Sequence, residues 1–216
     1  MISLALLTLL LILAACGSGG STIPTPHIPN NTPKLAAKQV LTFPNVGIVD
    51  SAPLDPALVS DSNTSLIVNM VYSGLVRENA QLEVVPDQAT WDISLDNSVY
   101  TFHLRQNIAF SDGTAVTART YVYSLTRALL PEVQSGIASF YEGGIVGAND
   151  VLRGKTKTLA GVKALDTWTL QIRLTRPMPY FLQMLTSSIF FPVNKQLIDK
   201  YGQAAWPNNV AGNAAG

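Results

Sequence analysis

Two stretches of this chain repeat one pattern, and that pattern requires antiparallel strands in the fold. Residues 91–104 read WDISLDNSVYTFHL, and residues 161–174 read GVKALDTWTLQIRL. Each stretch contains a strand, a polar turn with an aspartate, and a second strand in which apolar and polar residues alternate. The alternating apolar residues are Tyr100, Phe102 and Leu104 in the first stretch and Trp168, Leu170, Ile172 and Leu174 in the second. We therefore expect two antiparallel hairpins, each with one buried face.

A first strand and a first helix are expected before these hairpins. Residues 39–43 have the composition of a short strand. Residues 62–75, SNTSLIVNMVYSGL, have helical spacing. Ser62 is the expected N-cap of this helix, and Gly74 is the expected residue just past its C-terminus.

Residues 117–130, TARTYVYSLTRALL, form the most regular helical stretch. One stripe carries Ala118, Tyr121, Val122, Leu125 and Leu129, and the opposite stripe carries Arg119, Tyr123 and Arg127. Pro131 is expected to end this helix. A shorter helix is expected over residues 194–201, between Asn194 as its cap and Gly202. Because the hairpins and helices do not repeat as strand–helix–strand units, the sequence predicts the α+β class.

Residues 101–113, TFHLRQNIAFSDG, place a histidine, an arginine, a serine and an aspartate close together. In strand spacing His103 and Arg105 face away from the apolar side, and residues 111–113 have the composition of a turn. A catalytic nucleophile needs a base within hydrogen-bond reach and a third group that orients the base. No G-x-S-x-G elbow lies nearby. We interpret the stretch as a strand and a turn in a protein that is not an enzyme; a secreted hydrolase is the less favoured alternative.

The composition excludes several classes of site. The chain has 216 residues, of which 47% are hydrophobic, and 14 basic residues balance 14 acidic ones. A balanced charge gives no general attraction to nucleic acid, so we expect no nucleic-acid partner. One cysteine, Cys16, forms no intrachain disulfide. The two histidines, His27 and His103, are far apart in the sequence, and we expect neither a metal site nor a cofactor.

The N-terminus has the features of a targeting segment. Residues 2–15 are almost wholly apolar but shorter than the ~20 residues that span a bilayer. Small residues precede Cys16, which resembles the lipobox of bacterial lipoproteins and implies that this thiol carries a lipid. A generic export signal with an incidental cysteine is the alternative. Residues 17–38 are rich in Gly, Ser, Thr, Asn and Pro, which is typical of a linker. We therefore expect a signal peptide at 1–16, a linker at 17–38 and a folded part from residue 39.

Thirteen residues between positions 89 and 124 stand in the order of a known signature. They are Trp91, Asp96, Tyr100, Phe102, Leu104, Arg105, Phe110, Asp112, Gly113, Thr117, Ala118, Tyr123 and Ser124. The order resembles that of the family 5 extracellular solute-binding proteins, the oligopeptide, dipeptide and nickel binders of ABC importers. Further matches are LDP at 54–56, YSGL at 72–75 and PMPYF at 177–181. Ser73 stands where the family usually has a glutamate.

The resemblance implies the first lobe of a two-lobed, periplasmic-binding-protein-like fold of type II (cluster C). Residues 39–216 would be the N-terminal part of a peptide-type solute-binding domain, with the second lobe missing. The implied protein is a monomeric lipoprotein on the extracytoplasmic face of the cell membrane, in the periplasm or at the cell surface. It would capture short peptides and deliver them to an ABC permease.

The same resemblance implies which residues contact the ligand. Val49, Asp50 and Ser51 correspond to a segment that pairs with the peptide backbone. Residues 139–141 correspond to a loop whose aromatic residues, Phe140 and Tyr141, lie near the ligand. Two alternatives stay open: the ligand is nickel or another small solute, or the chain is a truncated remnant that binds nothing.

Overall fold

The computed structural model describes residues 54–202 of the chain. Several expectations lie outside these residues: the signal peptide with Cys16, the linker with His27, the strand at 39–43, and Val49, Asp50 and Ser51. Within the described residues, no helix combines the length and the hydropathy that crossing a membrane requires.

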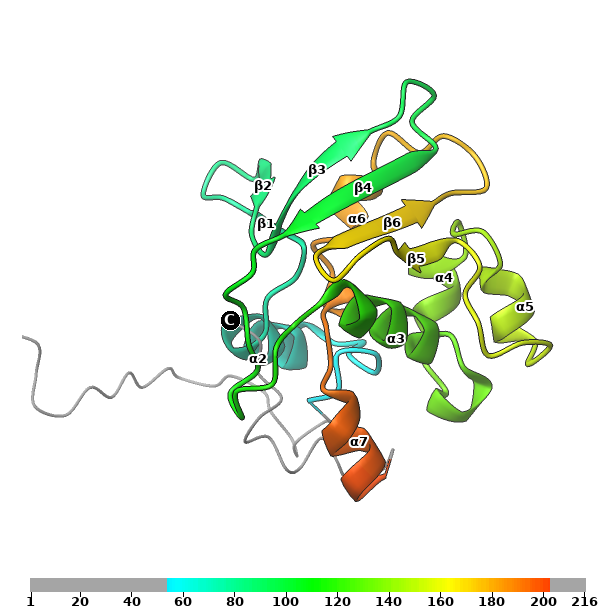
Figure 1. Ribbon diagram of the computed structural model, residues 1–216. Helices are drawn as coiled ribbons and strands as arrows, with labels where there is room; N and C mark the ends of the chain where they lie inside the picture. The colour runs from blue at the N-terminus through cyan, green and yellow to red at the C-terminus, as the bar shows by residue number, and fades with distance from the viewer. Residues whose placement is uncertain (1–53, 203–216) are drawn as a thin grey trace, which may run out of the picture. The chain divides into compact units, whose positions relative to one another are not determined.

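A four-stranded antiparallel sheet lies along one side of the described fold (Figure 1). Its strands are β3 (Ala89–Ile93), β4 (Val99–Leu104), β6 (Thr169–Arg173) and β5 (Val162–Ala164), in that order across the sheet. The two expected hairpins are therefore confirmed, and they pair with each other through β4 and β6. In this register Tyr100 lies opposite Ile172 and Phe102 opposite Leu170, and all four are buried. The alternation of the sequence thus fixes which face of the sheet enters the core.

The turn between β3 and β4 is held by Asp96. Its carboxylate accepts hydrogen bonds from the hydroxyls of Ser94 (2.6 Å) and Ser98 (2.7 Å) and from the Ser98 N–H (3.2 Å). The turn places Asn97 in the left-handed region, with φ of 53°, a conformation that asparagine tolerates well. The polar residues that mark this turn in the sequence are therefore the ones that close it.

Asp96 is expected to titrate near pH 2 in the folded chain. The three hydrogen bonds from Ser94 and Ser98 lower the pKa of its carboxyl from 3.8 to about 2. Because the folded-state pKa lies below the unfolded value, these bonds stabilise the fold above about pH 4, and that contribution is lost as the pH falls toward 2. Carboxyl-carbon NMR measures this pKa. The Ser98→Ala variant should raise it toward 3.8, and an Asp96 pKa near 3.8 in the unmodified chain would contradict the arrangement.

A second, two-stranded sheet was not anticipated from the sequence. Strand β1 (Val76–Glu78) pairs antiparallel with β2 (Val84–Pro86). The loop between them is organised by Asn79, whose side-chain oxygen accepts from the N–H groups of Gln81 (2.9 Å) and Glu83 (3.0 Å). Both strands have only three residues, too few for a readable alternation, and neither has a longer partner strand to mark the hairpin, as β6 does for β5.

Helix α2 (Ser62–Val71) confirms the expected helix but corrects both of its ends. The N-cap is Asp61 rather than Ser62, and its carboxylate accepts from the Thr64 N–H at 2.9 Å. Gly74 does not end the helix through a positive φ. It is buried instead, and a Cβ on it would lie 2.7 Å from the Phe191 ring. Gly74 therefore permits a close approach of two segments.

Helix α3 (Ala118–Ala128) packs against β5 and β6, as Figure 1 shows. The expected apolar stripe is largely confirmed, because Ala118, Tyr121, Leu125 and Leu129 are buried and Val122 is half-buried. The expected polar stripe is wrong at Arg127. That side chain is 2% exposed, and its guanidinium forms an ion pair with the equally buried Asp55.

The C-terminal helix α7 (Lys195–Tyr201) confirms its expected caps. The side chain of Asn194 accepts from the Gln196 N–H at 2.9 Å, and Gly202 follows the helix with φ of 80°. The amide of Asn194 also donates to Asp112 at 2.8 Å, which ties α7 to the turn at residues 111–113. In that turn Asp112 accepts from the Thr114 N–H and Gly113 has φ of 86°, as the sequence predicted.

The remaining helices are short. They are the 3-10 turns η1 (Pro131–Val133) and η2 (Ser188–Phe190), and the α-helices α4 (Ala138–Glu142), α5 (Ala148–Leu152) and α6 (Phe181–Met184). Each lacks the two full turns over which helical periodicity can be recognised. The Phe181 ring of α6 contacts the sheet, 4.9 Å from the Tyr100 ring, and it also lies 6.2 Å from the Phe190 ring of η2.

Candidate functional site

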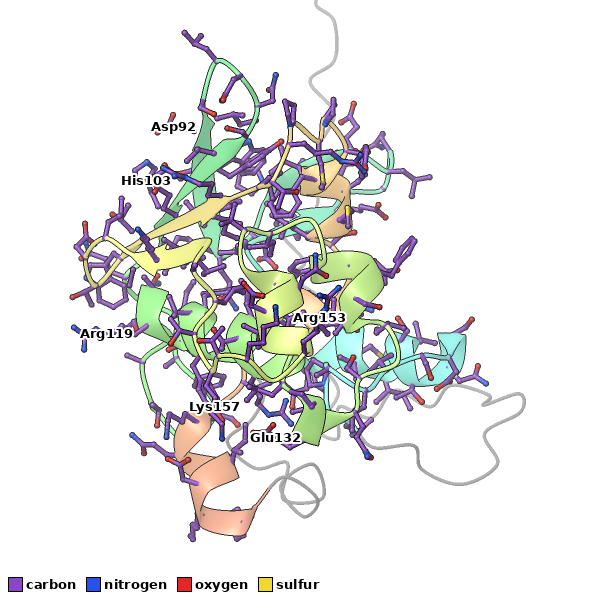
Figure 2. The ribbon with its side chains drawn as sticks, turned by 90° about the vertical axis from the view of Figure 1, so that its right-hand side faces the viewer. Asp92, His103, Arg119, Glu132, Arg153 and Lys157 are labelled. Atoms are coloured by element: carbon purple, nitrogen blue, oxygen red, sulfur yellow. The ribbon has the colours of Figure 1, made fainter. Side chains whose placement is uncertain are left out.

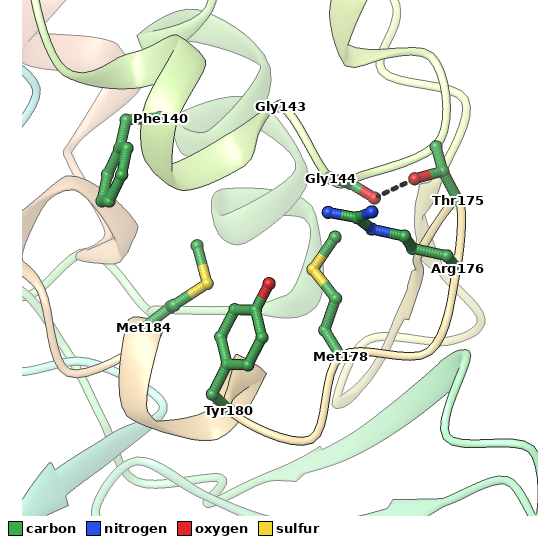
Figure 3. A pocket seen from close by; sticks show the side chains of 8 residues that line it. All are labelled: Phe140, Gly143, Gly144, Thr175, Arg176, Met178, Tyr180 and Met184. Atoms are coloured by element: carbon green, nitrogen blue, oxygen red, sulfur yellow. Dashed lines mark hydrogen bonds between the residues drawn. The ribbon is translucent and has the colours of Figure 1, made fainter.

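A hollow of about 620 Å³ opens between α4, α6 and the segment that follows β6. Figure 3 shows this hollow from close by. Eight described residues line it: Phe140, Gly143, Gly144, Thr175, Arg176, Met178, Tyr180 and Met184. The residues come from two stretches about thirty positions apart in the sequence, so the tertiary fold creates the hollow.

Two adjacent glycines form one wall of the hollow. A Cβ on Gly143 would overlap the Ser139 carbonyl oxygen, and a Cβ on Gly144 would overlap the end of the Met178 side chain. The Gly144 carbonyl accepts from both the N–H (2.9 Å) and the hydroxyl (3.1 Å) of Thr175. These bonds join the two stretches and fix the width of the hollow on this side.

The lining combines apolar side chains with hydrogen-bond donors. Phe140, Met178 and Met184 supply apolar surface, and methionine adapts its shape to varied partners. The Arg176 guanidinium and the Tyr180 hydroxyl point into the hollow (Figure 3). Neither Asp nor Glu is among the described lining residues. Such a surface suits an organic ligand with both apolar and polar parts.

The structure separates the two aromatic residues that the sequence had grouped as ligand contacts. Both lie in helix α4 rather than in a loop, which corrects that expectation. Phe140 is 76% exposed and lines the hollow. Tyr141 is half-buried, and its ring lies edge-on to Phe190 at 6.3 Å. Tyr141 lines a different, smaller hollow of about 250 Å³ beside Asp61 and Ser187.

Sequence reasoning missed most of the lining. Met178 and Tyr180 lie in the PMPYF stretch, where Pro177 and Pro179 restrict the backbone on either side of Met178. That stretch was identified as part of a family signature, but nothing in it indicates that Tyr180 stays exposed while Phe181 is buried. Arg176 belongs to none of the motifs that the sequence analysis identified.

A sequence model of the bacterial extracellular solute-binding proteins, family 5 (middle region), matches residues 83–215. The chain belongs to this family.

Individual members of family 5 agree with this assignment. The chain is 38% identical over 168 residues to the periplasmic murein peptide-binding protein MppA of Escherichia coli, covering 77% of this chain and 31% of that protein. It is 39% identical over 186 residues to the periplasmic oligopeptide-binding protein OppA of Escherichia coli, covering 84% of this chain and 34% of that protein. The chain therefore spans about a third of the length of these curated relatives.

A solved structure of an oligopeptide-binding protein shares the fold. Listeria monocytogenes OppA bound to peptide superposes with a TM-score of 0.66 at 30% identity, over 70% of this chain and 30% of that chain. The fold expected from the sequence, the mixed α and β structure of a periplasmic binding protein with antiparallel hairpins, is thereby confirmed.

A second hollow of this family 5 chain, of about 540 Å³, is polar in character. Its lining includes Tyr72, Ser73, Arg77 and Asp87. Burial raises the pKa of Asp87, while Arg105, 3.4 Å away, and Arg77 act in the opposite direction. The Tyr72 hydroxyl is buried and has no hydrogen-bond partner in the described part of the chain. Polar groups therefore make up more of the surface of this hollow than apolar groups, which is the reverse of the first hollow.

The His103 stretch forms no catalytic arrangement in the described structure. His103 and Asp92 lie side by side on the outer face of β4 and β3, with a 2.9 Å contact between imidazole Nε2 and a carboxylate oxygen (Figure 2). Both side chains are exposed, and such pairs contribute about 0–1 kcal/mol to stability. Across residues 54–202, His, Cys, Asp and Glu side chains do not gather in threes that could hold a metal ion. The family 5 relatives are solute-binding proteins, which is consistent with a non-enzymatic role.

Proposed function

We propose that this family 5 chain forms one wall of a peptide-binding site in the substrate-binding lipoprotein of an ABC importer. The protein would capture oligopeptides outside the membrane and deliver them to the permease. The observation that carries the proposal is the hollow at Phe140: the exposed Phe140 ring lines it together with Met178 and Met184, on a scaffold similar to that of Listeria monocytogenes OppA bound to peptide.

In the proposed mechanism the protein binds its ligand and catalyses no covalent reaction. An extended peptide offers its backbone N–H and C=O groups along its whole length, so a wall that pairs with them binds peptides largely independently of sequence. We propose that Val49, Asp50 and Ser51 provide this pairing. Phe140 supplies an apolar surface on which a peptide side chain packs, and Tyr141 supports α4 from the core side.

The proposed organisation places the wall outside the cell. Residues 1–16 act as the signal peptide, Cys16 carries the lipid, and residues 17–38 link the lipid to the binding part at 39–216. Two or more acyl chains at ~0.8 kcal/mol per buried CH₂ hold such a protein firmly at the membrane surface. The tethered protein is a monomer that meets its peptide in the periplasm or at the cell surface.

Calorimetric titration with a pool of tripeptides and tetrapeptides tests the proposal. The chain should release or absorb heat on binding, and Phe140→Ala should weaken the affinity about tenfold, the effect of losing about 1.4 kcal/mol of aromatic contact. The matched control is Leu95→Ala, because Leu95 is fully exposed at the tip of the β3–β4 hairpin and outside the hollow. Absence of any heat from a chain that circular dichroism shows to be folded would refute the proposal.

A further inference from the structure

We infer that the hollow at Phe140 selects peptides that carry a carboxylate beside an apolar side chain. Arg176 and Tyr180 would bind the carboxylate, and Phe140 and Met184 would receive the apolar side chain. This inference rests on the proposed function and gives its site a ligand class.

Two hydrogen-bond donors face the hollow without a protein partner. In the described part of the chain, the Arg176 guanidinium makes no ion pair and the Tyr180 hydroxyl makes no hydrogen bond. Both are exposed, and Figure 3 shows both directed toward the centre of the hollow. Some other exposed basic residues do have partners: Arg105 pairs with Asp87 and Lys195 with Asp199. Arg176 is therefore available to a ligand.

The chemistry of these donors favours a carboxylate. Guanidinium presents its N–H groups in a planar fork that matches the two oxygens of a carboxylate. A tyrosine hydroxyl adds a further donor to the same group. Among the described lining residues Arg176 carries the positive charge and no Asp or Glu balances it, so the hollow favours an anionic group over a cationic one.

The apolar part of the hollow defines the rest of the ligand. Phe140 presents an exposed ring, and Met178 and Met184 supply flexible thioether side chains. Gly144 leaves room for Met178, because a side chain at position 144 would overlap the end of the Met178 side chain. An aliphatic or aromatic side chain fits this surface while the neighbouring carboxylate reaches Arg176.

Three forms of one tetrapeptide ending in leucine distinguish the sources of the carboxylate. The first has a free C-terminus, the second a C-terminal amide, and the third is an amide with glutamate before the leucine. The unmodified chain should bind the free acid about tenfold more tightly than the plain amide in calorimetric titration. Equal affinity for the first and third forms would mean that a side-chain carboxylate serves as well as the C-terminal one.

Two matched variants assign the effect to Arg176. Arg176→Met should reduce the acid-to-amide preference to about one. Arg153→Met removes another exposed arginine that makes no ion pair in the described chain, and it should keep the full preference. Raising the salt concentration should weaken binding of the acid more than binding of the amide.

The outcomes separate this inference from the proposed function. Peptides that bind the unmodified chain equally well as acid and amide would overturn the carboxylate site and leave peptide binding intact. A preference that survives in Arg176→Met would do the same. Failure of all three peptides to bind a folded chain would overturn the proposed function and the inference together.

Discussion

Replacing Arg127 by methionine is expected to lower the free energy of unfolding by about 3–5 kcal/mol. The Arg127 guanidinium donates to both carboxylate oxygens of Asp55, at 3.1 Å and 2.5 Å. Asp55 is 0% exposed and Arg127 is 2% exposed. Methionine fills similar space but leaves the Asp55 carboxylate buried without its counter-charge. The expected loss of stability comes from the Asp55 charge left buried in the variant. The intact pair itself adds little net stability over an apolar replacement of both residues.

Urea unfolding followed by circular dichroism measures the loss. Arg119→Met is the matched control on the same helix, since Arg119 is exposed and projects away from the protein (Figure 2), and it should change stability by about 0.5 kcal/mol or less. The double variant Arg127→Met with Asp55→Leu should recover much of the stability, because no charge is then left buried. A loss below about 1 kcal/mol in Arg127→Met would show that water reaches this pair.

Replacing Phe181 by alanine should cost about 3–5 kcal/mol, the usual range for a fully buried aromatic ring. Phe181 is 1% exposed and begins α6. Its ring lies 4.9 Å from the Tyr100 ring at a tilt of 55° and 6.2 Å from the Phe190 ring. Alanine leaves a cavity among these rings, and the hydroxyl of Tyr100, which donates to the Met178 carbonyl at 3.0 Å, becomes less firmly placed.

The neighbouring residue gives a control that separates folding from binding. Tyr180 is 52% exposed, so Tyr180→Ala should change the unfolding free energy by about 0.5 kcal/mol or less. The same variant should weaken peptide binding, because the Tyr180 hydroxyl points into the hollow (Figure 3). If Tyr180→Ala were as destabilising as Phe181→Ala, the ring would be part of the core, and the assignment of Tyr180 to the binding wall would be wrong.

The sequence predicted the elements with enough residues to show their periodicity. The alternation at Tyr100, Phe102 and Leu104 gave both the strand β4 and its buried face. Helix α3, with three turns, was similarly clear. The strands β1 and β2 and the short helices α4, α5 and α6 were not predicted, because three to five residues give no period to recognise.

The candidate site was predicted only in part. Phe140 was identified through a family resemblance and lies in the hollow, but its neighbour Tyr141, named for the same reason, packs toward the core. One helical position separates exposure from burial here, and the sequence does not indicate which side of α4 faces the protein. Arg176 was missed because its role depends on the distant Gly143 and Phe140 for the shape around it.

The sequence by itself determined the two hairpins, the long helix, the caps of α7 and the family, because each rests on neighbouring residues or on a signature read along the chain. Only the tertiary structure decided which polar residues enter the core and which exposed residues meet. Arg127 is buried because its guanidinium pairs with Asp55, which lies 72 positions earlier in the sequence. The hollow exists because residues 140–144 and 175–184 are brought together by hydrogen bonds between Gly144 and Thr175. Local periodicity is a property of the backbone, whereas these contacts depend on how distant segments pack.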